Sequence, residues 1–183
     1  MKRTLRQWVV MAVLSFSGGV VFILPFLQEV YYEPLTEALG INNTEVGALM
    51  SVFGITSMIA YLPGGWLADR VSPRWLISLS LIATGLGGLY FATFPPYRIS
   101  LAIHAVWGVT IALLFWGAMI RATREWGGKD DPGKAFGILE TGRGIGEIVG
   151  YLGLGVVFVW LGGQIFAFST VVIIMSAMLI VLG

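Results

Sequence analysis

The sequence predicts an all-α membrane protein with six transmembrane helices. Hydrophobic residues make up 57% of the 183 residues and charged residues only 11%, whereas about a quarter of the residues are charged in a soluble domain. Long stretches without charge recur, each of about 20 residues, which is the length needed to cross a bilayer as a helix. Lysine and arginine gather in alternate connections between these stretches, as they do in membrane proteins with a fixed orientation.

The first predicted span covers residues 8–32. Three basic residues precede it: Lys2, Arg3 and Arg6. A signal peptide also begins with positive charge, but its apolar core is about 7 to 15 residues long and ends in a small-residue cleavage site. The uncharged run of residues 8–27 is longer and lacks such a site, so we expect a retained helix that Pro25 kinks.

The remaining five spans are bounded by polar or turn-forming residues. They are predicted at residues 44–67, 74–94, 99–120, 134–161 and 164–183. Residues 33–43 should form a short acidic connector, with Asn43 or Thr44 as the N-cap of the second span. Residues 95–96 are both proline and should end the third span.

The distribution of lysine and arginine predicts the orientation in the membrane. Nine of them fall on the side of the N-terminus: Lys2, Arg3, Arg6, Arg70, Arg74, Arg121, Arg124, Lys129 and Lys134. Only Arg98 falls on the opposite side, where four glutamates gather: Glu29, Glu33, Glu37 and Glu45. Cytoplasmic connections are enriched in lysine and arginine, so we expect a multi-pass protein of the cell's inner membrane with a cytoplasmic N-terminus. Residues 121–134 should be its most charged loop.

A polar turn at residues 64–74 joins the second and third spans and carries a motif. Its pattern is a glycine, three residues, Asp-Arg and a later basic residue: Gly65, Asp69, Arg70 and Arg74. These residues resemble motif A, the signature loop between the second and third helices of major facilitator superfamily transporters. Ser72 stands where a glycine is common, and Trp75 where a second basic residue is common.

This resemblance implies the architecture of the whole chain. Members of the family consist of two six-helix bundles, each built from two inverted three-helix repeats. The 183 residues would form the N-terminal bundle, and the C-terminal half would be absent from this sequence. Because the sequence ends in an apolar run, we expect a truncated product or a fragment.

The resemblance also implies a role for motif A as a cytoplasmic gate. In the family this loop holds the two halves together, and Asp69 would meet a helix N-terminus of the other half, where a carboxylate is favoured. Arg121 and Arg124 would pair with Asp69 or Glu125 at this gate. The alternative is a solvated turn whose charges only set topology.

Three charged residues within the fifth span are the candidates for substrate binding or proton coupling. Glu140, Arg143 and Glu147 share one helix face, and the last two have the i,i+4 spacing of an ion pair. Glu147 lies about 20 Å along the helix from Lys134, at a depth where charges usually mark a transport pathway. We expect Arg143 to attract an anion or to hold Glu147, and Glu147 or Glu140 to carry a proton. The alternatives are a structural ion pair and, for Glu140, a place in the cytoplasmic interface.

The same span contains a repeated glycine spacing, about 90° around the helix from the charged face. The glycines are Gly142, Gly146 and Gly150. Glycine at every fourth position is typical of close helix packing.

Several single residues have two interpretations each. His104 is the only histidine; it could carry a proton, since its unperturbed pKa is near 6.5, or it could pack near an interface. Trp107, Trp116 and Tyr61 could belong to an interfacial aromatic belt or could line a cavity.

The composition argues against other classes of function. The chain has no cysteine, no cluster of metal ligands and no phosphate-binding loop between a strand and a helix. We therefore expect no enzyme, cofactor, metal or nucleic acid. The predicted partners are the lipid bilayer, a small-molecule substrate, protons, and either the missing C-terminal half or a second copy.

The sequence predicts the N-terminal half of a secondary active transporter that moves a small polar or anionic organic solute by alternating access. One alternative is a six-helix half-transporter that works as a homodimer. The other is a membrane remnant or scaffold without transport activity.

Overall fold

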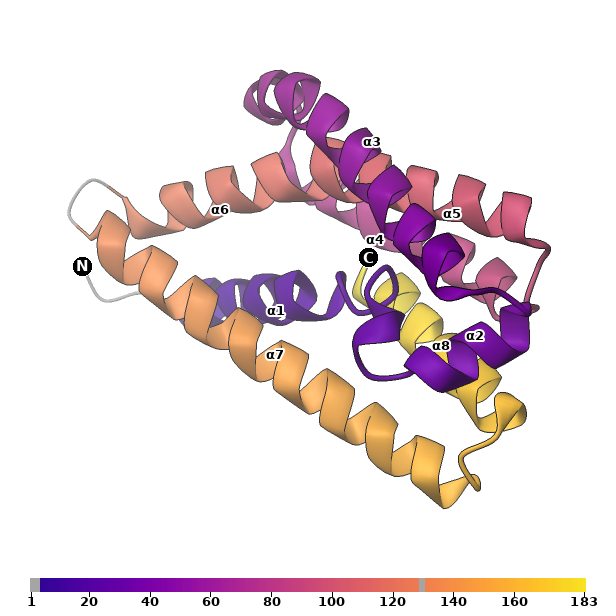
Figure 1. Ribbon diagram of the computed structural model, residues 1–183. Coiled ribbons are helices and arrows are strands. Elements are labelled where there is room, and N and C mark those ends of the chain that lie inside the picture. Colours follow the sequence, from indigo (N-terminus) through magenta and orange to yellow (C-terminus); the bar gives the residue numbers. More distant parts are fainter. Residues whose placement is uncertain (1–3, 129–130) are drawn as a thin grey trace.

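The computed structural model describes residues 4–128 and 131–183, and the regular elements of these residues are all helices (Figure 1). The α-helices are α1 Leu5–Val20, α2 Tyr32–Leu39, α3 Asn43–Arg70, α4 Pro73–Phe91, α5 Tyr97–Val109, α6 Gly117–Gly127, α7 Pro132–Trp160 and α8 Ile165–Leu182. A 3-10 turn, η1, covers Leu27–Glu29, and a π-helical segment, η2, covers Thr110–Trp116. Lys2, Arg3 and Lys129, on which the predicted orientation partly depends, lie outside the described residues.

Five helices of the described chain are long and apolar enough to cross a membrane. Four of them are α3, α4, α7 and α8; the fifth is the continuous run Tyr97–Gly127, which joins α5, η2 and α6. The sixth predicted span is represented by α1, a shorter apolar helix. An all-helical membrane bundle is therefore confirmed, whereas six separate spans are not.

The first helix ends earlier than predicted. It stops at Val20, and turns lead from there into η1. Pro25 has no N–H to donate to the carbonyl of Val21, and its ring crowds that carbonyl, so a regular helix cannot continue through this point. The 16 residues of α1 extend about 24 Å, less than the roughly 30 Å of a hydrocarbon core. The predicted span of residues 8–32 is therefore divided into α1, turns and η1, whereas a helix with a kink at Pro25 was expected.

The acidic connector at residues 33–43 is not an open loop. It contains α2, with Pro34 in the first turn, where a missing N–H costs nothing. Gly40 ends α2 in the left-handed conformation with φ of 63°, which favours glycine.

The N-cap of α3 is Asn42, one residue before the two predicted candidates, Asn43 and Thr44. The Asn42 side chain accepts hydrogen bonds from the backbone N–H groups of Thr44 at 2.9 Å and Glu45 at 3.1 Å. The Glu45 carboxylate in turn accepts from the backbone N–H of Asn42 at 2.9 Å. This reciprocal arrangement is a capping box.

The connections predicted at residues 64–74 and 121–134 are shorter than expected, because the charged residues extend the helices. The polar turn expected at residues 64–74 consists only of Val71 and Ser72, since α3 runs to Arg70 and α4 begins at Pro73. Likewise Arg121 and Arg124 lie within α6, not in a loop. Arginine is a good helix former, so a charge marks the end of the hydrocarbon without ending the helix.

The helices pack chiefly in three pairs: α1 with α7, α3 with the run from α5 to α6, and α4 with α8 (Figure 1). Trp107 lies fully buried in the core and donates its indole N–H to the carbonyl of Thr84 at 3.0 Å. Gly108 lets α5 approach α3, since an added Cβ would lie 2.6 Å from the carbonyl oxygen of Phe53. A side chain of a neighbouring helix satisfies a carbonyl at the start of η2: Ser80 donates to the Thr110 carbonyl at 2.9 Å.

Candidate functional site

A polar cavity of about 330 Å³ lies where α1 and its following turns meet α3, η2 and α7. Its walls combine charged, phenolic and apolar aromatic side chains: Gly19, Phe22, Ile23, Phe26, Glu29, Tyr61, Trp116, Arg143, Glu147 and Tyr151. Charged residues within a membrane bundle usually mark a pathway for a solute or ion, so this cavity is the candidate site.

Arg143 is held in the cavity wall by contacts in three directions. Its Nη1 donates to Glu140 at 2.8 and 2.9 Å, and its Nε donates to the carbonyl of Gly18 in α1 at 3.3 Å. The guanidinium carbon lies 5.1 Å from the centre of the Trp116 ring, within the range of a cation–π contact. The Arg143 side chain is only 19% exposed, so a positive charge is fixed beside the cavity.

The expected ion pair between Arg143 and Glu147 is not formed. Arg143 pairs instead with Glu140, one turn earlier. Side chains on an α-helix lean toward its N-terminus, and the contact of Nε with Gly18 also fixes the direction of the guanidinium. Glu147 is left with no salt bridge among the residues that the structure describes, although it lines the same cavity.

Glu147 shares the cavity with a second carboxylate, Glu29. Tyr151 lines this cavity together with both glutamates, and its hydroxyl donates to the Phe26 carbonyl at 3.5 Å. The sequence interpretation missed Glu29 because it placed this residue with the acidic groups of the outer connection. Tyr151 could have been found, because it lies four residues beyond Glu147 on the same helix face.

Close contact between two backbones forms one wall of the cavity. A Cβ added to Gly19 in α1 would collide with the carbonyl oxygen of Arg143 and lie 2.9 Å from the backbone nitrogen of Glu147. Only glycine allows α1 to approach α7 this closely.

The glycine repeat of α7 also faces α1. Gly142 lies against Ser15, and a Cβ added to Gly146 would lie 3.0 Å from the Phe16 carbonyl oxygen. Gly150 lies against Ile23. The repeat therefore sets the distance between the two helices that carry the cavity.

The aromatic and histidine candidates separate into two groups. Trp116 and Tyr61 line the cavity, whereas Trp107 belongs to the core. His104 is only 2% exposed and its Nδ1 lies 2.8 Å from the Ser100 carbonyl oxygen. Its ring lies 4.8 Å from the Trp107 ring, between centroids. The structure thus places His104 in the packed core between α4 and α5, outside the lining of the polar cavity.

Arg121 caps the C-terminal end of α3. Its Nη1 donates to the carbonyl oxygens of Ala68 at 2.6 Å and Val71 at 3.3 Å, and its Nε pairs with Glu125 at 2.6 Å. A cation at this position is favoured by the helix dipole and satisfies carbonyls that lack partners in the helix. Arg121 therefore joins α6 to α3.

The motif A residues lie at the surface: Gly65, Asp69, Arg70 and Arg74. Arg124, the other arginine predicted at the gate, is also exposed. Asp69 forms no salt bridge with any residue that the structure describes. The Arg70 guanidinium carbon lies 4.0 Å from the centre of the Trp66 ring. A Cβ on Gly65 would meet nothing within 4 Å, so this face of α3 is open.

Comparison with known proteins gives one family. The model of the Major Facilitator Superfamily matches residues 7–183. The inner membrane protein YqcE of Escherichia coli (strain K12) is 38% identical over 183 residues, which cover 97% of this chain and 42% of that protein. The inner membrane protein YihN of the same organism is 32% identical over 180 residues, which cover 98% of this chain and 43% of that protein.

A relative with a named solute is more distant. A probable hexose phosphate transport protein of Chlamydia trachomatis serovar D is 26% identical over 188 residues, covering 98% of this chain and 40% of that protein. The chain thus spans about two fifths of the length of these three relatives.

Proposed function

The chain belongs to the major facilitator superfamily, and we propose that it forms the N-terminal half of a secondary active transporter. The family consists of transporters rather than enzymes. The relatives named as inner membrane proteins and the five membrane-length helices support a multi-pass protein of the inner membrane. In this proposal the segment from α1 through η1 makes the first of six crossings, and the N-terminus is cytoplasmic.

The observation that carries the proposal is the fixed guanidinium of Arg143 beside a cavity within the bundle. Its contacts with Glu140 and Gly18 hold it in place, and the cavity leaves room for a small solute. An anion that enters would meet a positive charge that is already oriented, so little ordering is required on binding. We propose a small polar or anionic organic solute, which alternating movements of two bundles would expose to each side of the membrane in turn.

Glu147 is proposed to couple transport to protons. It has no salt-bridge partner in the described parts of the chain, and Glu29 lines the same cavity. Protonation of Glu147 would remove one of two negative charges from a site that must accept an anion. Solute and proton would then favour each other's binding.

The test is uptake of radiolabelled glucose 6-phosphate and gluconate into liposomes that contain the purified transporter, with and without an inward proton gradient. Glu147→Gln should abolish the stimulation by the gradient, and Arg143→Gln should abolish anion binding, measured as the loss of thermal stabilisation by the same probes. Glu33→Gln, on the exposed surface of α2, is the matched control. An unchanged proton dependence in Glu147→Gln would reject the coupling role, and wild-type anion binding in Arg143→Gln would reject the site.

The second half of the transporter is part of the proposal. Because the chain spans about two fifths of its relatives, we propose that a C-terminal bundle completes the solute site. The mass of the polypeptide and of its solubilised particle in native membranes tests this. A polypeptide of about twice this length supports the proposal, two copies of a short chain support a homodimer, and a lone short monomer supports a remnant without transport.

Asp69 is proposed to hold the cytoplasmic ends of the two bundles together. It is exposed at the end of α3, and Arg121 fixes this end to α6. A carboxylate there could meet a helix N-terminus of the other bundle, a contact favoured by about 0.3 to 1 kcal/mol. Asp69→Asn should therefore change transport rates and the populations of inward-open and outward-open states; unchanged values would contradict this role.

A further inference from the structure

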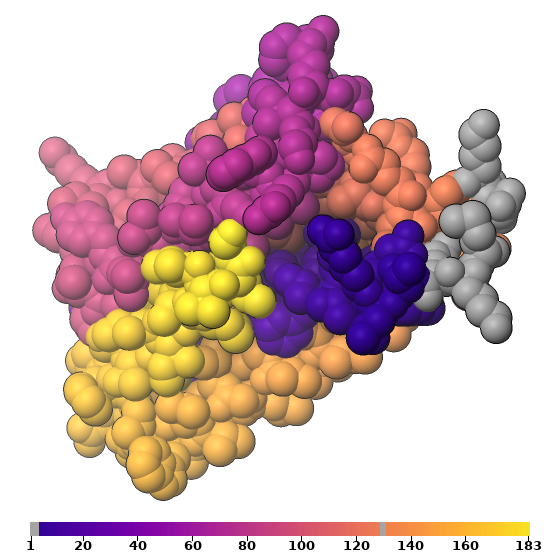
Figure 2. All heavy atoms as spheres, turned by 180° about the vertical axis from the view of Figure 1, so that it is seen from behind, coloured from indigo at the N-terminus to yellow at the C-terminus, as the bar shows by residue number. Residues whose placement is uncertain are grey.

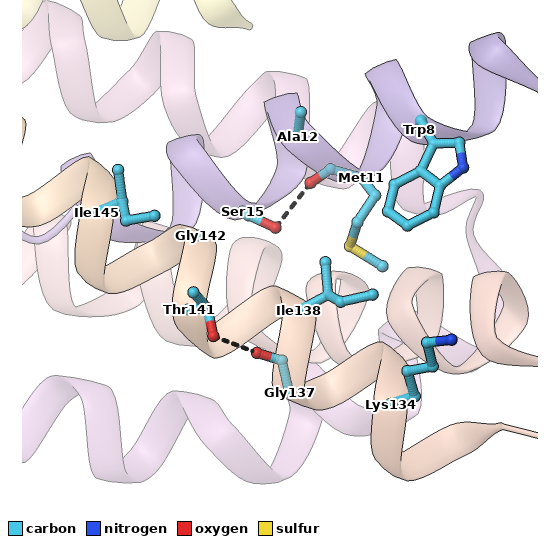
Figure 3. A pocket seen from close by; sticks show the side chains of 10 residues that line it. All are labelled: Trp8, Met11, Ala12, Ser15, Lys134, Gly137, Ile138, Thr141, Gly142 and Ile145. Carbon is cyan, nitrogen blue, oxygen red and sulfur yellow. Dashed lines mark hydrogen bonds between the residues drawn. The ribbon is translucent and has the colours of Figure 1, made fainter.

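A second and larger cavity, of about 690 Å³, lies between α1 and α7 (Figure 3). Its walls are apolar even where hydroxyl groups occur, because those groups are bonded within their own helices. Ser15 donates to the Met11 carbonyl at 2.7 Å, and Thr141 donates to the Gly137 carbonyl at 2.8 Å. We call this cavity the α1/α7 groove.

The groove and the polar cavity lie on opposite sides of α7. Ile145 lines the groove and Glu147 lines the cavity; at about 100° per residue the two positions lie about 160° apart around the helix. The face of α7 that carries the groove therefore points away from the charged site. The exposed apolar side chains of Ile148, Leu152 and Val156 continue along this face of α7, and exposed apolar patches of this kind mark contact with a membrane or a protein.

One end of the groove carries a positive charge. Lys134 lines the groove, lies in the first turn of α7 and is exposed. It forms no salt bridge within the described parts of the chain. Trp8, near the start of α1, lies at the same end (Figure 3), and tryptophan is enriched where a membrane meets water. From Lys134 to Ile145 the groove extends about 16 Å along α7.

We propose that the α1/α7 groove binds one acyl chain of an anionic membrane phospholipid, with its phosphate on Lys134. The groove has an apolar floor and a single ammonium group at one end, which matches the order of chain and phosphate in a lipid. The flexible stem of lysine allows the charge to follow a phosphate in the headgroup layer. Both walls are visible at the molecular surface as α1 and α7 in Figure 2. The proposal does not depend on the transported solute.

Native mass spectrometry of the detergent-solubilised protein, in the form that the cell makes, tests the proposal. The probes are palmitoyl-oleoyl phosphatidylglycerol, which is anionic, and palmitoyl-oleoyl phosphatidylethanolamine, which has the same chains and no net charge. Wild-type protein should retain one phosphatidylglycerol in preference to phosphatidylethanolamine. Lys134→Gln should weaken phosphatidylglycerol binding about fivefold, since one basic residue near an anionic surface contributes about that factor, and should leave phosphatidylethanolamine binding unchanged.

A second variant tests the groove itself, with a matched control on the same helix. Gly137→Phe places a ring in the groove, and no atom lies within 4 Å of its new Cβ, so the fold should tolerate it. Gly153→Phe makes the same change at another position where no atom lies within 4 Å. We expect Gly137→Phe to lose the retained lipid and Gly153→Phe to keep it, with both variants monodisperse in size-exclusion chromatography.

Three results would overturn the proposal. Equal lipid retention in Gly137→Phe and Gly153→Phe would mean that the groove is not the binding site. Equal phosphatidylglycerol affinity in wild type and Lys134→Gln would remove the role of the charge. Wild-type protein that retains no lipid would indicate that a protein segment covers the groove.

Discussion

The two sides of α7 show how one membrane helix carries opposite chemistry. Its cavity side holds Arg143 and Glu147 beside phenolic and aromatic rings, whereas its groove side presents apolar atoms along most of its length and one lysine at the end. The guanidinium within the span has contacts in three directions, while Lys134 has no salt-bridge partner in the described structure. A charge within a bilayer is costly and a charge at its surface is not. Arg143 therefore needs partners within the protein, whereas Lys134 does not.

The largest effect is expected at the glycine where α1 and α7 meet. Gly19→Ala would force the two backbones apart, because the new Cβ collides with the carbonyl oxygen of Arg143. Overpacking of this kind costs about 1 to 3 kcal/mol and sometimes more. Thermal unfolding in detergent should show a clear fall in melting temperature. Gly144→Ala, where the Cβ meets nothing within 4 Å, should melt at or slightly above the wild-type temperature, because alanine is the better helix former. Equal melting of both variants would mean that α1 and α7 are not in close contact.

The next largest effect distinguishes the roles of Arg143 and Lys134 in anion binding. The planar guanidinium of Arg143 donates to both Glu140 and the Gly18 carbonyl. In Arg143→Lys a point charge takes its place and cannot form both contacts. We expect anion binding to weaken about tenfold, or by ~1.4 kcal/mol. Isothermal titration with glucose 6-phosphate measures this loss, and Lys134→Gln should leave the affinity unchanged. A stronger effect from Lys134→Gln than from Arg143→Lys would place the solute in the groove.

A smaller effect is expected for the partner of Arg143. The Glu140 side chain is 58% exposed, and exposed ion pairs contribute about 0 to 1 kcal/mol. Glu140→Gln should therefore change the free energy of unfolding by less than about 1 kcal/mol. It should also raise the affinity of the cavity for an anion, because Arg143 loses a competing carboxylate. Weaker anion binding would show that Glu140 is needed to orient Arg143.

The comparison of the two sides also shows which features a sequence can reveal. The helical spacing alone places Glu140, Arg143 and Glu147 on one side of α7. The choice between the two glutamates could not be predicted, because it depends on the direction of the Arg143 side chain and on the Gly18 carbonyl, which another helix supplies. Helix ends were misplaced where charged residues extend a helix into water.

The position of Glu29 was unpredictable for a related reason. Pro25 ends the regular helix, and the turns that follow bring Glu29 back against the cavity. A sequence pattern assumes a continuous helix and places Glu29 outside. Motif A could be found without knowledge of the fold, because its residues lie close together in the sequence. The family that it indicated matches residues 7–183.

The smallest effect is expected for Tyr31→Phe, which tests whether the polar region beside Tyr151 extends as far as the Tyr31 hydroxyl. Tyr31, which lies outside the membrane-length helices, is 2% exposed, and its hydroxyl has no hydrogen-bond partner among the described residues. Its ring packs against Phe158 and Phe168 with centroids 5.2 and 5.8 Å apart. Tyr31→Phe keeps these contacts and removes an unsatisfied polar group, so at pH 8 the free energy of unfolding should change by less than about 1 kcal/mol or increase.

Alkaline pH provides the control for this variant. Burial raises the pKa of Tyr31 from its ordinary value of 10.0 to about 12. The folded protein therefore holds this proton more tightly than the unfolded chain does, and the resulting stability is present below pH 10 and is lost as the pH rises toward 12. Melting temperatures at pH 8 and 11 should show a greater loss in wild type than in Tyr31→Phe. An equal loss would mean that the Tyr31 hydroxyl is hydrated, and that the polar region beside Tyr151 extends to it.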